Sequence, residues 1–191
     1  MTTPEALISA KIRRRADGLE LWFLRIRRTT GLPPSAFGVL VALAVTAIVA
    51  SGALHPGIKS SDAALFLASG AFFGVSLGMI AGIMPRMIEA ARADLAELAP
   101  LYPGDGASLT HASGALSRLT PGTTSALTAL GIAAGILHAW LLGHMALPWW
   151  PALAQTLGTL ALWVAMMLSM TPLFMNALLF DQLGRHAEPD L

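Results

Sequence analysis

The chain of 191 residues lacks cysteine altogether and carries little charge. Without cysteine it has no disulfides, thiolate metal sites, iron–sulfur clusters or cysteine nucleophiles. Only 12% of its residues are Asp, Glu, Lys or Arg, whereas an ordinary soluble domain has roughly 25%. The net charge of +1 is uninformative, so the distribution of the charges carries the signal.

Three long stretches, at 33–57, 63–85 and 119–180, contain no Asp, Glu, Lys or Arg. A water-soluble fold needs charge on its outer faces, so uncharged stretches of this length indicate contact with lipid. They are apolar throughout, without the alternation that strands of a membrane barrel show. We therefore expect an all-α integral membrane protein, built as a four-helix transmembrane bundle with amphipathic cytoplasmic helices.

Four spans of about 20 residues fit the uncharged stretches. Thr120 is a candidate cap for the third span, with Pro121 at its first helical position. Pro172 is expected to kink or end the fourth, although apolar residues continue beyond it. We divide the chain into a basic segment, 1–32, and a membrane domain, 33–191. The predicted spans are 35–54, 63–84, 121–147 and 151–171.

Basic residues predict the orientation of the spans. Lys59 is the one Lys or Arg in the loops that join spans one to two and three to four, and the other basic residues fall on the opposite side. By the positive-inside rule that side is the cytoplasm. We therefore expect both termini there, in a bacterial inner membrane. The polar stretch before the first span is too long for the start of a signal peptide, so we expect a retained anchor.

Residues 4–28 predict an amphipathic helix, with apolar members that include Trp22, Phe23 and Ile26. Such a helix lies on an anionic leaflet with its basic side toward the phosphates. A basic tail that only sets the topology is the alternative. The predicted headgroup-binding residues are Lys11, Arg13, Arg14, Arg15, Arg25, Arg27 and Arg28.

A second amphipathic segment, 86–99, continues span two past Pro85, with Ile88, Ala91, Leu95 and Leu98 on one face. We expect this segment to dock on the same chain, and a signal-transmitting extension is the alternative. Residues 101–119 are rich in Gly, Ser and Pro and predict a loop.

Small residues recur at every fourth position in spans two and three. Such stripes let helices approach closely in lipid. One interpretation is that the stripes pack the four helices of one subunit together. The other is that they join subunits, since the stripe of span two is longer than packing against one neighbouring helix requires. The predicted packing or oligomerisation residues are Gly70, Gly74, Gly78, Gly82, Gly131, Gly135, Ala139 and Gly143.

Histidines supply the ionisable groups near the spans. His138 and His144 do not share a face of a continuous helix, because six residues rotate by about 240°. We interpret them and His55 as interfacial side chains. A metal site of His55, Asp62 and His144, or a haem b between His55 and His144, is the less favoured alternative.

The sequence contains no HExxH motif, paired intramembrane carboxylates or Ser/His/Asp arrangement, so an enzyme is not expected. We expect a non-enzymatic accessory, scaffolding or regulatory (sensory) subunit without a cofactor. Its expected partners are anionic lipids and its own copies or a membrane complex, not nucleic acid. The alternatives are an oligomeric channel or small-solute transporter, and a haem- or metal-binding redox subunit.

Overall fold

A computed structural model of the chain describes residues 14–98 and 106–186. Four of its helices are long and apolar enough to cross a membrane, which indicates an integral membrane protein. Strands are confined, in this part of the chain, to one short antiparallel ribbon. The elements are β1 (Leu19–Glu20), α2 (Trp22–Thr30), α3 (Pro34–Ala50), η1 (Ser51–Leu54), α4 (Ser60–Leu98), α5 (Gly106–Ala115), β2 (Arg118–Leu119), α6 (Pro121–Leu141), η3 (His144–Ala146) and α7 (Trp149–His186).

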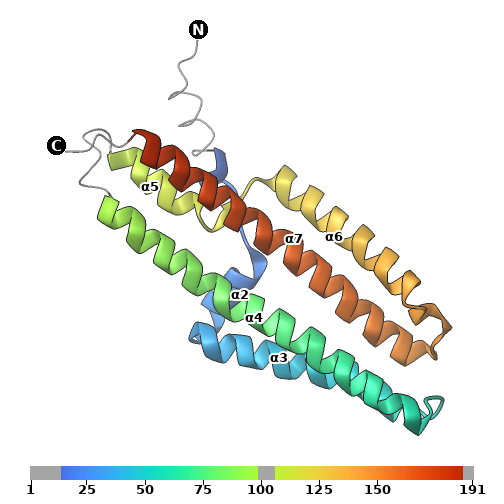
Figure 1. The fold of residues 1–191 in the computed structure, drawn as a ribbon. Helices are drawn as coiled ribbons and strands as arrows, with labels where there is room; N and C mark the ends of the chain where they lie inside the picture. Colours follow the sequence, from blue (N-terminus) through green and yellow to red (C-terminus); the bar gives the residue numbers. More distant parts are fainter. Residues whose placement is uncertain (1–13, 99–105, 187–191) are drawn as a thin grey trace.

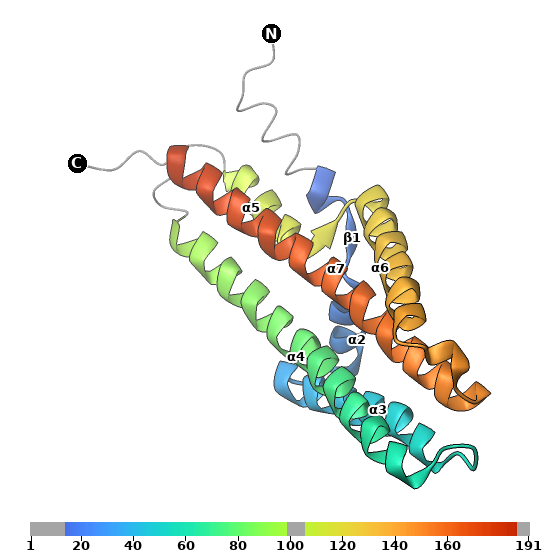
Figure 2. The same ribbon diagram turned by 45° about the vertical axis from the view of Figure 1, so that its right-hand side comes forward.

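The four long helices form two hairpins, α3–α4 and α6–α7, which meet where α4 packs against α7 (Figure 1). In Figure 2, α6 lies on the outer side of α7, away from α4. Gly158 of α7 marks the junction, because a Cβ there would lie 2.9 Å from the ring of Phe73 on α4 and 3.2 Å from Val49 on α3. The molecule is therefore a pair of hairpins joined along their inner helices.

Two predicted span ends differ from the structure. The third span ends at Leu141 rather than at 147, because Gly143 adopts a left-handed φ of 70° and turns the chain into η3. The fourth helix continues through Pro172 to His186. A proline removes one backbone donor, and packed neighbours let transmembrane helices tolerate that loss. Pro172 is fully buried, as is Pro85 inside α4.

The glycine stripe of α4 faces α3 along its whole length. A Cβ on Gly78 would lie 2.6 Å from the carbonyl oxygen of Gly38. A Cβ on Gly70 or on Gly82 would likewise meet backbone atoms of α3. A Cβ on Gly74 would meet Ala42 and Thr46 of α3. The stripe is thus occupied within the chain, and a second subunit using these glycines would have to displace α3.

The stripe of span three packs within the chain too, with one correction. Gly131 and Gly135 approach the backbone of α7 at Val164 and Leu160, and Ala139 is fully buried. Gly143 is exposed and follows the end of α6. The prediction that Gly143 belongs to the packing stripe was wrong, because the helix stops before it.

The predicted single helix over 4–28 was also wrong in its described part; residues 1–13 lie outside the described residues. Helical turns end at Ala16, and β1 then pairs with β2 before α2 begins. Figure 2 shows this ribbon beside the first turn of α6. A Cβ on Gly18 would meet the backbone of Leu119, so the chain passes this point with no room for a larger side chain.

The predicted loop over 101–119 instead contains α5 and β2, while residues 101–105 lie outside the described residues. Apolar residues make this possible, because Ala112 and Leu116 are at most 1% exposed in an apolar cluster. Ile88 and Leu95 of α4 are buried in the same cluster. The extension of α4 thus packs on the same chain.

Candidate anion-binding site at the basic end

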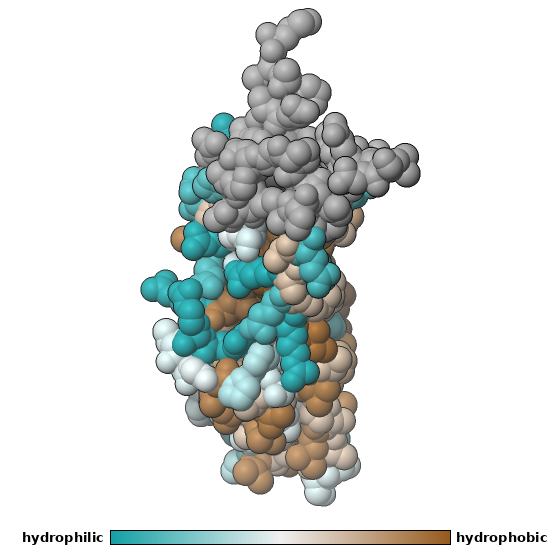
Figure 3. Space-filling model, turned by 90° about the vertical axis from the view of Figure 1, so that its left-hand side faces the viewer, coloured by the Kyte–Doolittle hydropathy of each residue, from teal (hydrophilic) through white to brown (hydrophobic). Residues whose placement is uncertain are grey.

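The described part of the chain gathers arginines at one end of the bundle, which we call the basic end. It comprises residues 14–32, the last turns of α4, the segment from α5 to β2, and the last turns of α7. Figure 3 shows hydrophilic residues in a band here, between the grey residues and the hydrophobic helices. The opposite end carries Trp149 and Trp150 in the first turn of α7.

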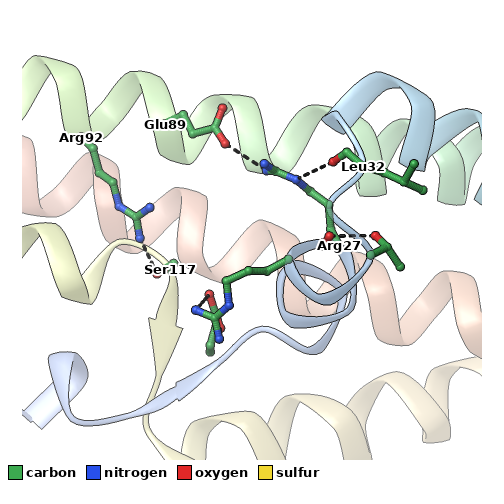
Figure 4. A network of polar contacts seen from close by, with 8 residues as sticks. Arg27, Leu32, Glu89, Arg92 and Ser117 are labelled. Carbon is green, nitrogen blue, oxygen red and sulfur yellow. Dashed lines mark hydrogen bonds and ion pairs between the residues drawn. The ribbon is translucent and has the colours of Figure 1, made fainter.

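A polar pocket of about 310 Å³ opens between α2, α4, Glu20 of β1 and Ser117, which precedes β2, at the basic end. Leu24, Pro85 and Ile88 supply its apolar part. Charged and polar side chains supply the rest, and Figure 4 shows several of them approaching from different elements. These polar lining residues are Glu20, Arg27, Arg28, Glu89, Arg92 and Ser117.

Arg27 is held in place from two sides. It lies in the last turn of α2, where Gly31 takes a left-handed φ of 67° and reverses the chain. Its Nε donates to the carbonyl oxygen of Leu32 at 3.4 Å, and its Nη1 donates to Oε1 of Glu89 at 2.9 Å. Glu89 is half exposed, so the pair orients Arg27 more than it stabilises the fold.

Arg28 and Arg92 complete the pocket with different partners. Arg28 forms an ion pair of 3.0 Å with Glu20. Arg92 donates from Nη2 to the hydroxyl oxygen of Ser117 at 2.9 Å (Figure 4). Within the described part of the chain, Arg92 thus bonds to a neutral hydroxyl and forms no ion pair with a carboxylate.

Arg15 does not line the pocket, because its side chain is buried between β2 and α7. Its Nε donates to the carbonyl oxygen of Arg118 at 2.9 Å, and its Nη2 donates to Oδ1 of Asn176 at 2.8 Å. Asn176 in turn donates to the carbonyl oxygen of Leu116 at 3.3 Å. Burial lowers the pKa of Arg15 to about 10, because an apolar environment disfavours the charged form.

The predicted headgroup-binding residues therefore separate in space. Arg14, Arg25 and Arg28 are exposed and Arg27 is partly exposed. Arg15 is only 6% exposed, so the prediction that its side chain reaches lipid headgroups was wrong. Its neighbours in sequence could not reveal this, because the ribbon that buries it joins segments about a hundred residues apart. Lys11 and Arg13 lie outside the described residues.

The three candidate histidines, His55, His138 and His144, lie toward the opposite end of the bundle. His144 is 7% exposed, and its Nδ1 lacks a partner among the described residues. Burial lowers the pKa of His144, because an apolar environment disfavours the protonated form. His138 accepts a hydrogen bond on Nδ1 from Nε1 of Trp163 at 2.9 Å. Because α6 ends between His138 and His144, the sequence argument that placed them on different faces of one continuous helix does not apply.

No group of three His, Asp or Glu side chains within residues 14–98 and 106–186 is arranged to hold a metal ion. His55, Asp62 and His144 therefore do not come together as such a group in this structure. His55 instead accepts from the backbone N–H of Gly57 at 3.1 Å in a local turn. The haem alternative stays a prediction, which a Soret band would test.

Sequence reasoning did not single out Ser117, Arg92 or Asn176 as site residues. The one available signal was an Asn in an otherwise apolar helix, which ordinary interhelical hydrogen bonding also explains. Comparison of the chain with models of protein families, with curated proteins and with solved structures found no match.

Proposed function

We propose that this chain is a non-enzymatic, multi-pass membrane subunit with an accessory, scaffolding or regulatory role. It acts by helix packing with its own copies or with a partner complex. The basic end lies on the cytoplasmic side of a bacterial inner membrane, as the distribution of Lys and Arg favours. The exposed Trp149, at the opposite end, suits the aromatic belt of the outer interface.

The observation that carries the proposal is that one short segment contacts both hairpins. Arg15 reaches β2, which leads into the second hairpin, and Asn176 on α7. Phe23 and Leu24 of α2 are buried in the cluster that contains Ile88 of α4. A partner that moves this segment therefore acts on both hairpins at once, because the buried contacts must change together.

The outer side of α2 supports an interfacial position for this segment. Trp22 is 51% and Ile26 is 44% exposed, and Arg25 beside them is exposed. Apolar side chains next to arginines suit the boundary between headgroups and acyl chains. The segment is thus placed to respond to the membrane surface or to a cytoplasmic partner.

Self-association, in this proposal, uses lipid-facing surfaces rather than the glycine stripe of α4, which α3 covers. The outward side of α6 is the most open, since Ile136 is 51% and Trp140 is 66% exposed. Helices associate in lipid by close packing, so such a surface can accept another transmembrane helix.

Purification from native membranes tests the proposal. Native mass spectrometry of the purified protein should give a protein mass well above the 20.0 kDa of one chain, from further copies or from a stoichiometric partner. An Ile136→Ala, Trp140→Ala variant should shift toward the monomer, and a Leu54→Ala variant at the exposed outer turn is the control. A wild-type monomer without a partner would overturn the proposal.

Orientation is tested separately with reporters. A reporter fused after Arg185 and one inserted within 99–105 should both be active only in the cytoplasm. Activity of either reporter outside the cell would contradict the proposed placement, whatever the result of the purification.

A further inference from the structure

The polar pocket at the basic end has an excess of positive charge. Arg27, Arg28 and Arg92 line it, against the two carboxylates of Glu20 and Glu89. Each carboxylate pairs with one arginine, at 2.9 Å for Arg27 and 3.0 Å for Arg28. The excess charge therefore belongs to Arg92, whose recorded partner in the described part of the chain is a hydroxyl.

The geometry favours a phosphate group over other anions. An arginine offers five donors in a planar fork, and it binds phosphate oxygens through two parallel hydrogen bonds. Arg92 uses Nη2 on Ser117, which orients the fork and leaves other donors for a ligand. Arg27 is likewise oriented by Leu32 and Glu89, so both side chains have already lost part of their rotamer freedom.

A second hollow lies along the turns of α4 that precede the pocket. Pro85 lines the pocket, and the next residue, Arg86, lines an open groove between α3 and α4 with a volume of about 310 Å³. The groove is apolar, and Gly38, Gly78 and Gly82 line it where α3 and α4 approach each other closely. Arg86 is exposed at the end of the groove nearest the pocket.

We infer that the pocket binds the phosphate group of an anionic phospholipid, with Arg92 as its main donor and an acyl chain in the α3–α4 groove. The inference rests on the proposed membrane placement of the basic end. A cationic pocket beside an apolar groove matches the two chemically different parts of one lipid. Figure 3 shows hydrophilic residues bordering hydrophobic ones, an arrangement that suits the boundary between headgroups and acyl chains.

Lipid retention in nanodiscs tests the inference. The protein is reconstituted in phosphatidylcholine with and without phosphatidylglycerol, released into mild detergent, and its bound phosphatidylglycerol is counted by native mass spectrometry. Arg92→Gln should reduce the affinity about fivefold, the effect of one cation near an anionic surface. Arg25→Gln removes an exposed arginine of α2 that does not line the pocket, and it should retain the lipid.

A variant with the opposite sign separates binding from folding. Glu89→Gln removes a negative charge from the pocket, so it should raise phosphatidylglycerol retention above the wild type. Loss of folding cannot produce that gain. Equal retention by the wild type, Arg92→Gln and Glu89→Gln overturns the inference, as does an equal loss in Arg92→Gln and Arg25→Gln.

A phosphate titration distinguishes the source of the ligand. Inorganic phosphate, added to protein in phosphatidylcholine nanodiscs, should stabilise it much less than phosphatidylglycerol does. Saturable stabilisation by inorganic phosphate alone, abolished by Arg92→Gln, would overturn the lipid assignment in favour of a soluble phosphate compound. Retention is measured regardless of which side the reporters identify as cytoplasmic, so the inference and the proposed function fail independently.

Discussion

Nη2 of Arg15 donates a 2.8 Å hydrogen bond to Oδ1 of Asn176, which lies 161 positions later in the chain. The bond joins the segment before the first span to the last helix. Arg15 is 6% and Asn176 is 7% exposed, so neither group can exchange its partner for water without local opening. The contact therefore couples the two ends of the described chain.

Replacing Asn176 with Leu should destabilise the protein by about 2 kcal/mol, because a buried charge loses one of its acceptors. Arg15→Met should cost less when combined with Asn176→Leu than the sum of the two single changes, since the pair is then removed together. The measurement is the free energy of unfolding in mixed micelles with increasing dodecyl sulfate. Additive effects would show that the two side chains are not coupled.

Gly78→Ala should destabilise the α3–α4 hairpin by about 1–3 kcal/mol, as expected for an overpacked interface. The new Cβ would lie 2.6 Å from a backbone oxygen of Gly38, which cannot move aside cheaply. Gly122→Ala is the matched control, because nothing lies within 4 Å of its Cβ position in the first turn of α6. Equal thermal midpoints for the two variants would contradict the close approach.

Gln155 joins the two hairpins at membrane depth, where its Nε2 donates to Oγ of Ser69 at 2.6 Å. Interhelical hydrogen bonds in lipid contribute about 0.6 kcal/mol on average. A double-mutant cycle with Gln155→Leu and Ser69→Ala should therefore give a coupling of about that size, well below the effect of Asn176→Leu. A coupling near zero would mean that the bond does not form in the bilayer.

His144 should make stability depend on pH. Burial lowers its pKa in the folded protein below the ordinary value of 6.5. Above that value the group is neutral in both states and has no effect. As the pH falls through 6.5, the unfolded chain takes up a proton before the folded one, so stability decreases. The decrease ends below the folded pKa.

His144→Phe should flatten this part of the pH profile, measured by thermal unfolding in nanodiscs. His55→Gln, also in a loop at the opposite end from the arginines, is the control and should keep the dependence. An unchanged slope in His144→Phe would show that another group titrates.

The spans could be predicted because their signal is local. An uncharged segment of about 20 residues forms a helix in lipid, because few other structures satisfy its backbone there. All four predicted spans coincide with long helices. Their ends were less predictable. Pro172 marks a break in a water-soluble helix, but here it is buried against neighbours that hold the helix together.

Sequence alone determined the class of this protein, a bundle of membrane-crossing helices, because hydropathy and helix length act within each segment. Tertiary structure decided the rest. It placed the glycines of α4 against α3, interrupted the N-terminal segment with β1, buried Arg15 and left Arg92 beside an open pocket. These outcomes depend on pairing between segments far apart in the chain, and no periodicity within a segment specifies its distant neighbour.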